Sequence, residues 1–443
     1  MRRNLAKQLK EYLNRSEPYK NVLLLEGARQ VGKSYLVADV LKDYQGQNLV
    51  SINLEESPII REKIDECPDF ASFQFLTTEV WGLDVEKPGI LFIDEAQESR
   101  QIGSFVRFMK ENWADTSVVL TGSSMARLFD HTRVPVGRVE YLRLYPYCFS
   151  EFLRALEKEH LLDDCRNQIF DCPLSKHTAL LELYDAYLQV GGLPSVVEAY
   201  KQEPHGNGYS IKRQEIYISQ KDDFHRKETG LKHHLFESTI KAVARNLASP
   251  FKLTSISDNH RDAKQALSQL TRWHIVLPCE QQGLNPTSNY SPKVYLYDIG
   301  LAKQFRESVL PKLSTAKTED SLLRNALGGL VENAVFISLL SGKGFLTPPT
   351  GWKKDPKNPV EIDFILNSGA VPLPIEVKAA KKYNQRFGSS LLEYLHLTGL
   401  KRGVLVSAAP YQVDRIRDCE IINLPLYYCL ASTLEQLIPQ SAV

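Results

Sequence analysis

Residues 27–34 read Gly-Ala-Arg-Gln-Val-Gly-Lys-Ser, which fits the pattern G-x-x-x-x-G-K-[ST]. The pattern follows an apolar run at 21–25 and precedes a helix-like run, the context in which such a loop wraps phosphate groups with its backbone N–H groups. Lys33 would reach the β- and γ-phosphates of a nucleotide, and the Ser34 hydroxyl would bind Mg²⁺. We expect the nucleotide to contact Gly27, Ala28, Arg29, Gln30, Val31, Gly32, Lys33, Ser34 and Tyr35.

Two carboxylates follow the apolar run 89–93 and complete this candidate site. Asp94 would bind the magnesium ion, directly or through water, and Glu95 would orient and deprotonate the attacking water. The sequence therefore predicts nucleotide hydrolysis and not binding alone, with Lys33 and Glu95 as catalytic residues.

Two further segments offer polar groups to the nucleotide. Ser123, with Thr121 and Ser124, ends the strand-like run 117–122 and could sense the γ-phosphate, although an ordinary strand-to-loop turn explains these residues as well. Arg138 could act as an arginine finger to a neighbouring subunit or as a sensor within the chain. A surface arginine is the alternative.

A second group of candidate residues lies near the C-terminus. Glu376 and Lys378 face the same side of a predicted strand because side chains repeat every two residues, and Asp363 lies on another predicted strand. Glu332, in a helix-like segment, could join Asp363 and Glu376 around Mg²⁺ or Mn²⁺, with Lys378 as a catalytic residue that orients water or stabilises the phosphate. A solvated salt-bridge face is the alternative.

Composition limits the classes of protein. The 443 residues carry a formal net charge of +1, with 43% hydrophobic and 24% charged residues, which excludes a disordered chain and one that holds polyanions by net charge. The seven cysteines are scattered without metal-ligand spacing, and no uninterrupted apolar run is long enough to cross a membrane. We therefore expect a cytoplasmic protein that does not engage a membrane.

The order of predicted elements gives an α/β chain of several domains. Strand-like and helix-like runs alternate over 20–145, as in a parallel sheet with helical crossovers. Helix-periodic sequence follows, then two closely spaced helical signals and a strand-like run typical of a winged-helix unit, and then strands again. The expected domains are an ATPase core at 1–155, a helical domain at 156–245, a winged-helix unit at 246–285 and an α/β domain at 286–443.

The motifs together resemble prokaryotic AAA-type P-loop ATPases that carry a restriction-endonuclease-like C-terminal domain of otherwise unknown function. The resemblance rests on GARQVGKS, ILFIDEAQ, LTGSS, GRVEYLRLYPYCFSEFL, VGGLP and KVYLYDIGLA, and it covers nearly the whole chain. It implies an ASCE-class core in which one strand lies between the phosphate-loop strand and the Asp-Glu strand. For the C-terminal domain it implies a PD-(D/E)xK nuclease core whose positions are filled by Glu332, Asp363, Glu376 and Lys378.

We therefore expect Mg²⁺-dependent ATP hydrolysis coupled to a nuclease-like domain that binds DNA. DNA contacts could come from the winged-helix unit, through Asn259, His260, Arg261, Lys264 and Arg272, or from the basic cluster of Lys378, Lys381, Lys382 and Arg386. The alternative is a nucleotide-dependent switch or scaffold whose nuclease-like domain does not cut. A homo-oligomer is a further expectation.

Overall fold

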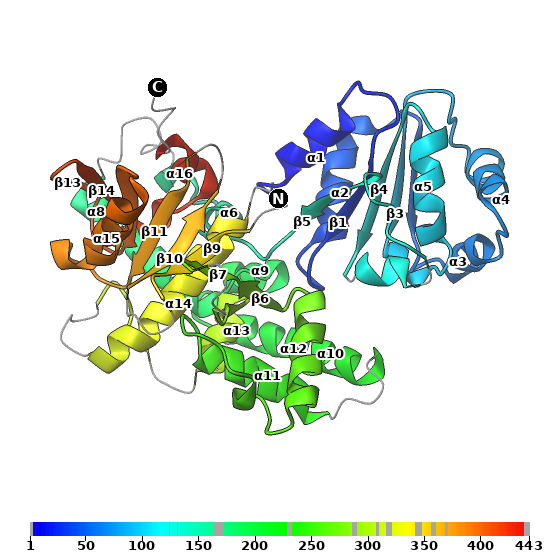
Figure 1. Cartoon of the computed structure of the whole chain (residues 1–443). Helices are drawn as coiled ribbons and strands as arrows, with labels where there is room; N and C mark the ends of the chain where they lie inside the picture. Colours follow the sequence, from blue (N-terminus) through cyan, green and yellow to red (C-terminus); the bar gives the residue numbers. More distant parts are fainter. Residues whose placement is uncertain are drawn as a thin grey trace. The chain divides into compact units, whose positions relative to one another are not determined.

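The computed structural model describes residues 3–123, 125–130, 132–162, 172–227, 233–285, 290–306, 310–315, 321–341, 348–355, 360–367 and 371–437. The chain divides into two compact units (Figure 1). Within the described residues, the first unit comprises 3–145 and the second begins at Pro146. The first unit thus ends before the expected domain boundary at 155.

The first unit is built on a five-stranded parallel sheet in the order β2-β3-β4-β1-β5. All residues of β1, β3 and β4 are buried, as expected for parallel strands that are covered on both faces. The strands are β1 (Val22–Glu26), β2 (Leu49–Asn53), β3 (Gly89–Asp94), β4 (Thr116–Gly122) and β5 (Val139–Arg143). They match the five predicted runs, and β4 lies between β1 and β3 as the resemblance implied.

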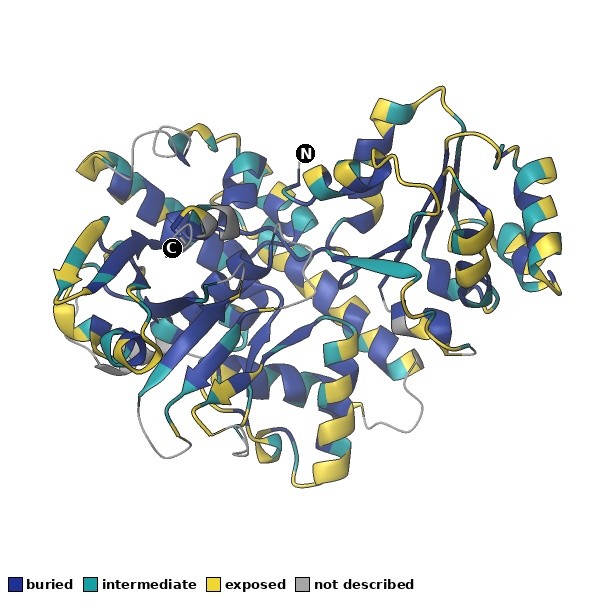
Figure 2. Cartoon of the chain, turned by 45° about the horizontal axis from the view of Figure 1, so that its top comes forward, coloured by how far each residue is buried: buried dark blue, intermediate teal, exposed yellow. Residues whose placement is uncertain are grey.

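The strand order places helices on both faces of this sheet. The crossovers β1→β2 and β3→β4 run in opposite directions along the sheet, so right-handed connections put α2 and α5 on opposite faces (Figure 1). The helices are α1 (Ala6–Leu13), α2 (Lys33–Leu41), α3 (Pro58–Asp65), α4 (Phe70–Phe75) and α5 (Ile102–Asn112). In Figure 2 the central strands β1, β3 and β4 are dark blue and β5, at the edge of the sheet, is mostly teal, whereas the helices are buried only along the side that packs inward.

The second unit opens with a helical region, as predicted. The helices are α6 (Phe149–Ala155), α8 (Leu174–Val190), α9 (Pro194–Gln202), α10 (Gly208–Lys227), α11 (His234–Arg245), α12 (His260–Arg272) and α13 (Ile299–Gln304). Asn259 caps α12, because its side chain accepts hydrogen bonds from the backbone N–H groups of Arg261 and Asp262. Strands β6 (Val276–Cys279) and β8 (Lys293–Leu296) pair as an antiparallel ribbon. Of the two helical segments expected in the winged-helix unit, one is α12 and the other is only a short 3₁₀ turn at Leu253–Ser255, so the assignment of that fold stays a prediction.

A seven-stranded mixed sheet forms the rest of this unit, in the order β13-β14-β12-β11-β10-β9-β7. Its strands are β7 (Gln281–Gly283), β9 (Thr350–Lys353), β10 (Glu361–Leu366), β11 (Leu373–Lys378), β12 (Arg402–Ser407), β13 (Gln412–Ile416) and β14 (Cys419–Pro425). Helices α14 (Ser321–Leu340), α15 (Ser389–Thr398) and α16 (Ala431–Leu437) accompany it. Strand β7 pairs with β9, and β6 pairs with β8, so strand pairing crosses the expected boundary at residue 285.

Two of the recognised motifs pack against each other inside the second unit. The carboxylate of Asp298, in KVYLYDIGLA, accepts a hydrogen bond of 2.7 Å from the backbone N–H of Gly192, in VGGLP. Gly191 has φ +87°, and a Cβ there would lie 2.5 Å from Asp298 Oδ2. These glycines therefore allow a close approach of α8 and α13, which gives both motifs a structural role.

No helix in the described ranges has the length and hydrophobicity that a membrane crossing requires. In those ranges Cys67, Cys279, Cys419 and Cys429 form no disulfide, and Cys165 lies outside them.

Candidate functional site

The loop between β1 and α2 has the backbone shape that its glycines predict. Gly27 has φ +155° and packs so closely that a Cβ would lie 2.2 Å from the carbonyl oxygen of Leu144. Gly32 has φ +92° and is the N-cap of α2, a left-handed conformation that glycine adopts without strain. The loop thus turns sharply into the N-terminus of α2, where free backbone N–H groups favour an anion.

Lys33 is buried and folded over this loop. Its Nζ donates hydrogen bonds to the carbonyl oxygens of Gly27, at 3.0 Å, and Ala28, at 3.1 Å. Burial lowers the pKa of the Lys33 ammonium, and the carboxylates of Glu95 and Asp94 partly oppose that shift. Because the Lys33 ammonium donates to neutral carbonyls, it can bind the phosphate of an incoming nucleotide without first breaking an ion pair.

The other predicted loop residues surround this arrangement. Ala28 and Val31 are buried, Arg29 and Gly32 are half-buried, and Gln30, Ser34 and Tyr35 are exposed. One anchor was not predicted. The Arg3 guanidinium donates hydrogen bonds of 2.8 Å to the carbonyl of Val31 and 2.5 Å to that of Tyr145. The N-terminal segment therefore fixes the backbone of the phosphate loop at Val31.

Asp94 lies at the same end of the sheet as the loop. The Asp94 carboxylate accepts hydrogen bonds from the Thr121 hydroxyl and from the backbone N–H of Glu95. Thr121 lies opposite Leu25 in the pairing of β4 with β1, and β4 lies between β1 and β3, so its hydroxyl binds Asp94 from the strand next to the phosphate-loop strand. The Ser34 hydroxyl and this hydroxyl-bound carboxylate offer the oxygen ligands that Mg²⁺ takes, and the backbone N–H groups of the glycine loop can bind phosphates, so the residues fit a magnesium-bound nucleotide.

Glu95 has a left-handed backbone, with φ +50°, that turns the chain directly after β3. Its carboxylate accepts a hydrogen bond from the Gln97 amide, while Gln97 Oε1 is buried without a hydrogen-bond partner among the described residues. Ser123 is buried at the end of β4, and Ser124 lies outside the described residues. Gln97 was not predicted as a site residue, although it lies only two residues after Glu95.

Arg138 does not lie where a sensor within the chain would have to be. Its backbone carbonyl accepts a hydrogen bond from Val22 N, at the start of β1, whereas the phosphate loop follows the end of that strand. A five-residue strand places these two edges about 13 Å apart. The Arg138 guanidinium instead pairs with Glu111, at 3.0 Å, on the surface. The in-chain sensor interpretation is therefore wrong, and the contact with a neighbouring subunit stays a prediction.

The C-terminal candidates do come together, around a lysine that was not predicted. Lys293 Nζ lies 2.8 Å from Asp363 Oδ1 and 3.0 Å from Glu332 Oε1. On β11, which pairs with the strand of Asp363, Lys378 Nζ lies 2.5 Å from Glu376 Oε1. We call Glu332, Asp363, Glu376, Lys293 and Lys378 the acid–lysine cluster.

Burial shifts most of these groups. It raises the pKa of Glu376 to about 8 and that of Glu332 to about 7, helped in each case by the charge of Asp363. Burial alone would raise the pKa of Asp363 as well, but the ammonium groups of Lys293 and Lys378 outweigh it and hold that pKa below its usual value. For Lys293, burial would lower the pKa, but the carboxylates outweigh it and hold the pKa well above its usual value.

The acid–lysine cluster does not fit the predicted metal site. The ligand oxygens of Glu332, Asp363 and Glu376 do not all lie within 4.8 Å of one another, and the Lys293 ammonium occupies the space between two of them. Within the described ranges the compact set of this kind is His396, Asp418 and Cys419, where Asp418 is already ion-paired with Lys401. We assign no metal to that set.

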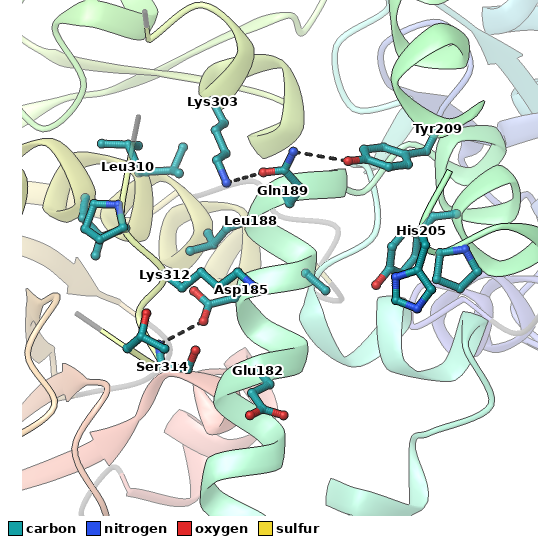
Figure 3. Close-up of a pocket in the computed structure, with 17 residues that line it drawn as sticks. Glu182, Asp185, Leu188, Gln189, His205, Tyr209, Lys303, Leu310, Lys312 and Ser314 are labelled. Atoms are coloured by element: carbon teal, nitrogen blue, oxygen red, sulfur yellow. Dashed lines mark hydrogen bonds between the residues drawn. The ribbon is translucent and has the colours of Figure 1, made fainter. Parts of the chain in front are cut away.

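A cavity of about 470 Å³ lies between α8, α13 and the segment 310–315 (Figure 3). Its polar groups largely bind one another. Asp185 accepts hydrogen bonds from the backbone N–H groups of Leu313 and Ser314, and Gln189 links Lys303 to Tyr209. The lining therefore specifies no ligand.

In the acid–lysine cluster, Lys293 and Tyr295 were not predicted from the sequence. The Tyr295 hydroxyl donates a hydrogen bond of 2.6 Å to Glu332 Oε1, beside Lys293. A signal exists in the sequence, because a lysine and a tyrosine two residues apart on one apolar strand face the same side. Their acidic partners, however, lie 37 to 70 residues further along the chain.

Comparison with known protein families identifies three segments. Residues 19–153 match a model described as an AAA domain. Residues 181–309 match a domain of unknown function (DUF8612), and residues 327–427 match another domain of unknown function (DUF4143). Comparison with curated proteins gives no match.

Solved structures show similarity at low identity. A Walker-type ATPase of Pyrococcus abyssi, paby2304, is 16% identical with a TM-score of 0.43, and the match covers 68% of this chain and 94% of the other. Cdc6p from Pyrobaculum aerophilum is 14% identical with a TM-score of 0.28, and the match covers 68% of this chain and 92% of the other.

The family match and the site geometry agree on the first unit. It has the parallel sheet, the glycine loop around the buried Lys33, and the Asp94–Glu95 pair at the end of β3, which is separated from β1 by β4. The match of residues 19–153 to an AAA domain and the P-loop geometry of the first unit together support ATP binding and hydrolysis.

Proposed function

We propose that this protein is a Mg²⁺-dependent ATPase whose nucleotide state controls a DNA-binding, nuclease-like module formed by the C-terminal sheet. The observation that carries the ATPase half is the meeting of the phosphate loop, Lys33 and the Asp94–Glu95 pair at one edge of a parallel sheet.

Each residue at this edge has a distinct task. The backbone N–H groups of 27–33 bind the phosphates, and Lys33 leaves the carbonyls of Gly27 and Ala28 to bind the terminal phosphate oxygens. Ser34 and Asp94 would hold Mg²⁺, with the Thr121 hydroxyl fixing the Asp94 carboxylate. Bound Mg²⁺ supplies electrostatic stabilisation of the charge on the transferred phosphoryl group.

Glu95 acts as the general base for the attacking water. Its carboxylate projects from a turn directly after β3 and is oriented by the Gln97 amide. A carboxylate held by one amide keeps other lone pairs available to accept a proton from water.

The variant Glu95→Gln tests this assignment. We expect ATP turnover to fall by about 10²–10⁴-fold, the range for removal of a general base, while ATP remains bound. Glu98→Gln, three residues further along, is the matched control and should keep wild-type turnover. Equal turnover in Glu95→Gln and wild type would show that Glu95 is not the base.

DNA binding is proposed from two basic surfaces of the second unit. One is the exposed side of α12, where Arg261, Lys264 and Arg272 recur at helical spacing. The other includes Lys382 and Arg386, which are exposed near the acid–lysine cluster. Asn259 is better explained as the cap of α12 than as a base contact.

Fluorescence anisotropy with a labelled DNA duplex distinguishes these surfaces. We expect charge reversal at Lys264 or at Lys382 to weaken binding, and each lost phosphate contact to reduce the slope of log affinity against log salt by about 1. Lys7→Glu, on the exposed side of α1, is the control. Binding that no charge reversal changes would refute a DNA-binding role for both surfaces.

A second candidate function is a nucleotide-dependent switch or scaffold whose nuclease-like module does not cut. The ion pairs of Lys293 with Asp363 and Glu332 favour it. A cleavage assay with Mg²⁺ or Mn²⁺ on linear, nicked and single-stranded DNA, with Asp363→Ala as the comparison, separates the two functions. Cutting by the wild type that Asp363→Ala abolishes would favour the nuclease.

A further inference from the structure

We propose that the Lys293 ammonium takes the place of a catalytic metal ion in the acid–lysine cluster, so that the C-terminal module binds no divalent cation there. The inference rests on the second candidate function above and gives it a physical basis. It assigns Lys293 as the resident cation of a site whose acids keep a nuclease-like arrangement.

The first support is the position of Lys293. Its side chain is 1% exposed, and its Nζ lies 2.8 Å from Asp363 Oδ1, 3.0 Å from Glu332 Oε1 and 3.6 Å from Glu361 Oε1. A buried ammonium is costly unless carboxylates surround it, and here three do. The cluster is therefore built around this lysine, which reaches it from β8 as α14 and β10 supply the acids.

The second support is the use of the carboxylate oxygens. Asp363 Oδ1 binds Lys293, and Asp363 Oδ2 accepts a hydrogen bond of 2.9 Å from the backbone N–H of Val377. Glu332 Oε1 accepts from both Lys293 and the Tyr295 hydroxyl. A magnesium ion that shared these oxygens would lie beside an ammonium group, and the two cations would repel each other.

The third support is the balance of charge. Three carboxyl groups of the cluster face two ammonium groups, those of Lys293 and Lys378, which leaves one acid over. Glu376 is paired with Lys378 through Oε1, and its Oε2 is buried with no hydrogen-bond partner among the described residues. With all five groups charged, the cluster carries one net negative charge, and a divalent ion would turn this into a buried positive charge.

These three features point to one consequence. The module keeps an acid on a helix, an acid on a strand and the Glu-x-Lys pair, but an internal lysine is ion-paired with two of the acids. Such a site can stabilise the fold and present Lys378, whose side chain is 36% exposed, to a phosphate group. The Lys293 ammonium lies against Asp363 and Glu332, where metal-assisted hydrolysis would require the ion.

Mn²⁺ binding to the full chain, measured by electron paramagnetic resonance without nucleotide, tests the inference. All proteins carry Asp94→Asn, so that the ATPase site does not contribute. We expect no stoichiometric Mn²⁺ in the protein with Lys293 and one equivalent after Lys293→Met, lost again when Asp363→Asn is added. Lys354→Met, which removes a lysine of a half-exposed ion pair on β9's flank, is the control and should bind none.

One equivalent of Mn²⁺ in the protein with Lys293, abolished by Glu376→Gln, would overturn the inference. Failure of Lys293→Met to gain Mn²⁺ while it stays folded would also overturn it. If Lys293→Met does not fold, the comparison of the Lys293 protein with Glu376→Gln still decides. ATP turnover of the chain with native Asp94 is measured in parallel, so a failure of the proposed ATPase is distinguished from a failure of this inference.

Discussion

Lys33 and Lys293 are both buried lysines that face acidic side chains, yet their surroundings differ in kind. Lys33 donates to two neutral carbonyls of its own loop, and burial lowers the pKa of its ammonium. Lys293 is paired with carboxylates, which outweigh burial and raise the pKa of its ammonium. The Lys33 ammonium, which donates only to carbonyls, can move to an incoming phosphate. The Lys293 ammonium, which is ion-paired with carboxylates, stabilises the fold instead.

The strongest test of this difference exchanges each lysine for methionine. We expect Lys33→Met to lose ATP turnover by about 10²–10³-fold with little change in unfolding, because it removes a cation that acts on the substrate. We expect Lys293→Met to destabilise the second unit by about 3–5 kcal/mol, because it leaves buried carboxylates uncompensated. ATP turnover and thermal unfolding by circular dichroism measure the two effects.

Lys354→Met is the control for the second effect. It removes a half-exposed ion pair with Glu393 and should cost less than about 1 kcal/mol. The proposed difference between the two lysines would be contradicted if Lys33→Met unfolded the chain, or if Lys293→Met had the same thermal unfolding midpoint as the wild type.

The stability of the second unit should decrease as pH rises toward 8. Burial raises the pKa of Glu376 from 4.5 to about 8, so across that window the folded state holds a proton that the unfolded state has released. The free energy of unfolding then falls by up to about 1.4 kcal/mol per pH unit, and the contribution is lost above the folded pKa. Glu332, raised to about 7, acts in the same direction.

Urea unfolding between about pH 6.5 and pH 8.5 measures this slope. Glu376→Gln is the matched variant, because its amide cannot titrate, and the difference between the two proteins cancels groups such as His177 that they share. A slope that is equal in both would mean that Glu376 is ionised in the folded protein.

A smaller effect is expected behind the phosphate loop. Arg3→Ala removes the two hydrogen bonds that fix the carbonyls of Val31 and Tyr145. Each is worth about 0.5–1.5 kcal/mol, so we expect the KM for ATP to rise by about 3–10-fold with kcat nearly unchanged. Steady-state kinetics, with Lys7→Ala as control, measures the split. A fall in kcat at constant KM would place Arg3 in the chemical step instead.

The smallest effect is expected at Arg138. Its ion pair with Glu111 is exposed and contributes at most about 1 kcal/mol. Arg138→Ala should therefore unfold like the wild type and hydrolyse ATP at the same rate across a range of protein concentrations. A loss of turnover that grows with self-association would establish it as an arginine finger to a neighbouring subunit.

The phosphate loop was predictable because its function depends on residues that are neighbours in the sequence. Gly27, Gly32 and Lys33 act through the conformation of one short segment, and the apolar strands around it have the runs typical of a buried parallel sheet. The Asp94–Glu95 pair was equally predictable, since it directly follows such a strand. Arg138 was misplaced as a sensor within the chain because the motif does not say which edge of the sheet it occupies.

The C-terminal site shows where the sequence stops being sufficient. Spacing predicted that Glu376 and Lys378 share one face of a strand, the resemblance implied that Glu332 and Asp363 join them, and the structure brings the four into one cluster. Neither the spacing nor the resemblance predicted that Lys293 would enter that cluster and change a metal site into a set of ion pairs.

The sequence by itself determined the phosphate loop, its two carboxylates and the alternation of strands and helices, because each depends on residues that are neighbours in the chain. Only the tertiary structure decided what lies between Glu332 and Asp363. Lys293 is separated from them by 39 and 70 residues, and it reaches them because β8, α14 and β10 pack together. The charge of a buried cluster is a sum over such contacts, so one distant lysine can set its chemistry.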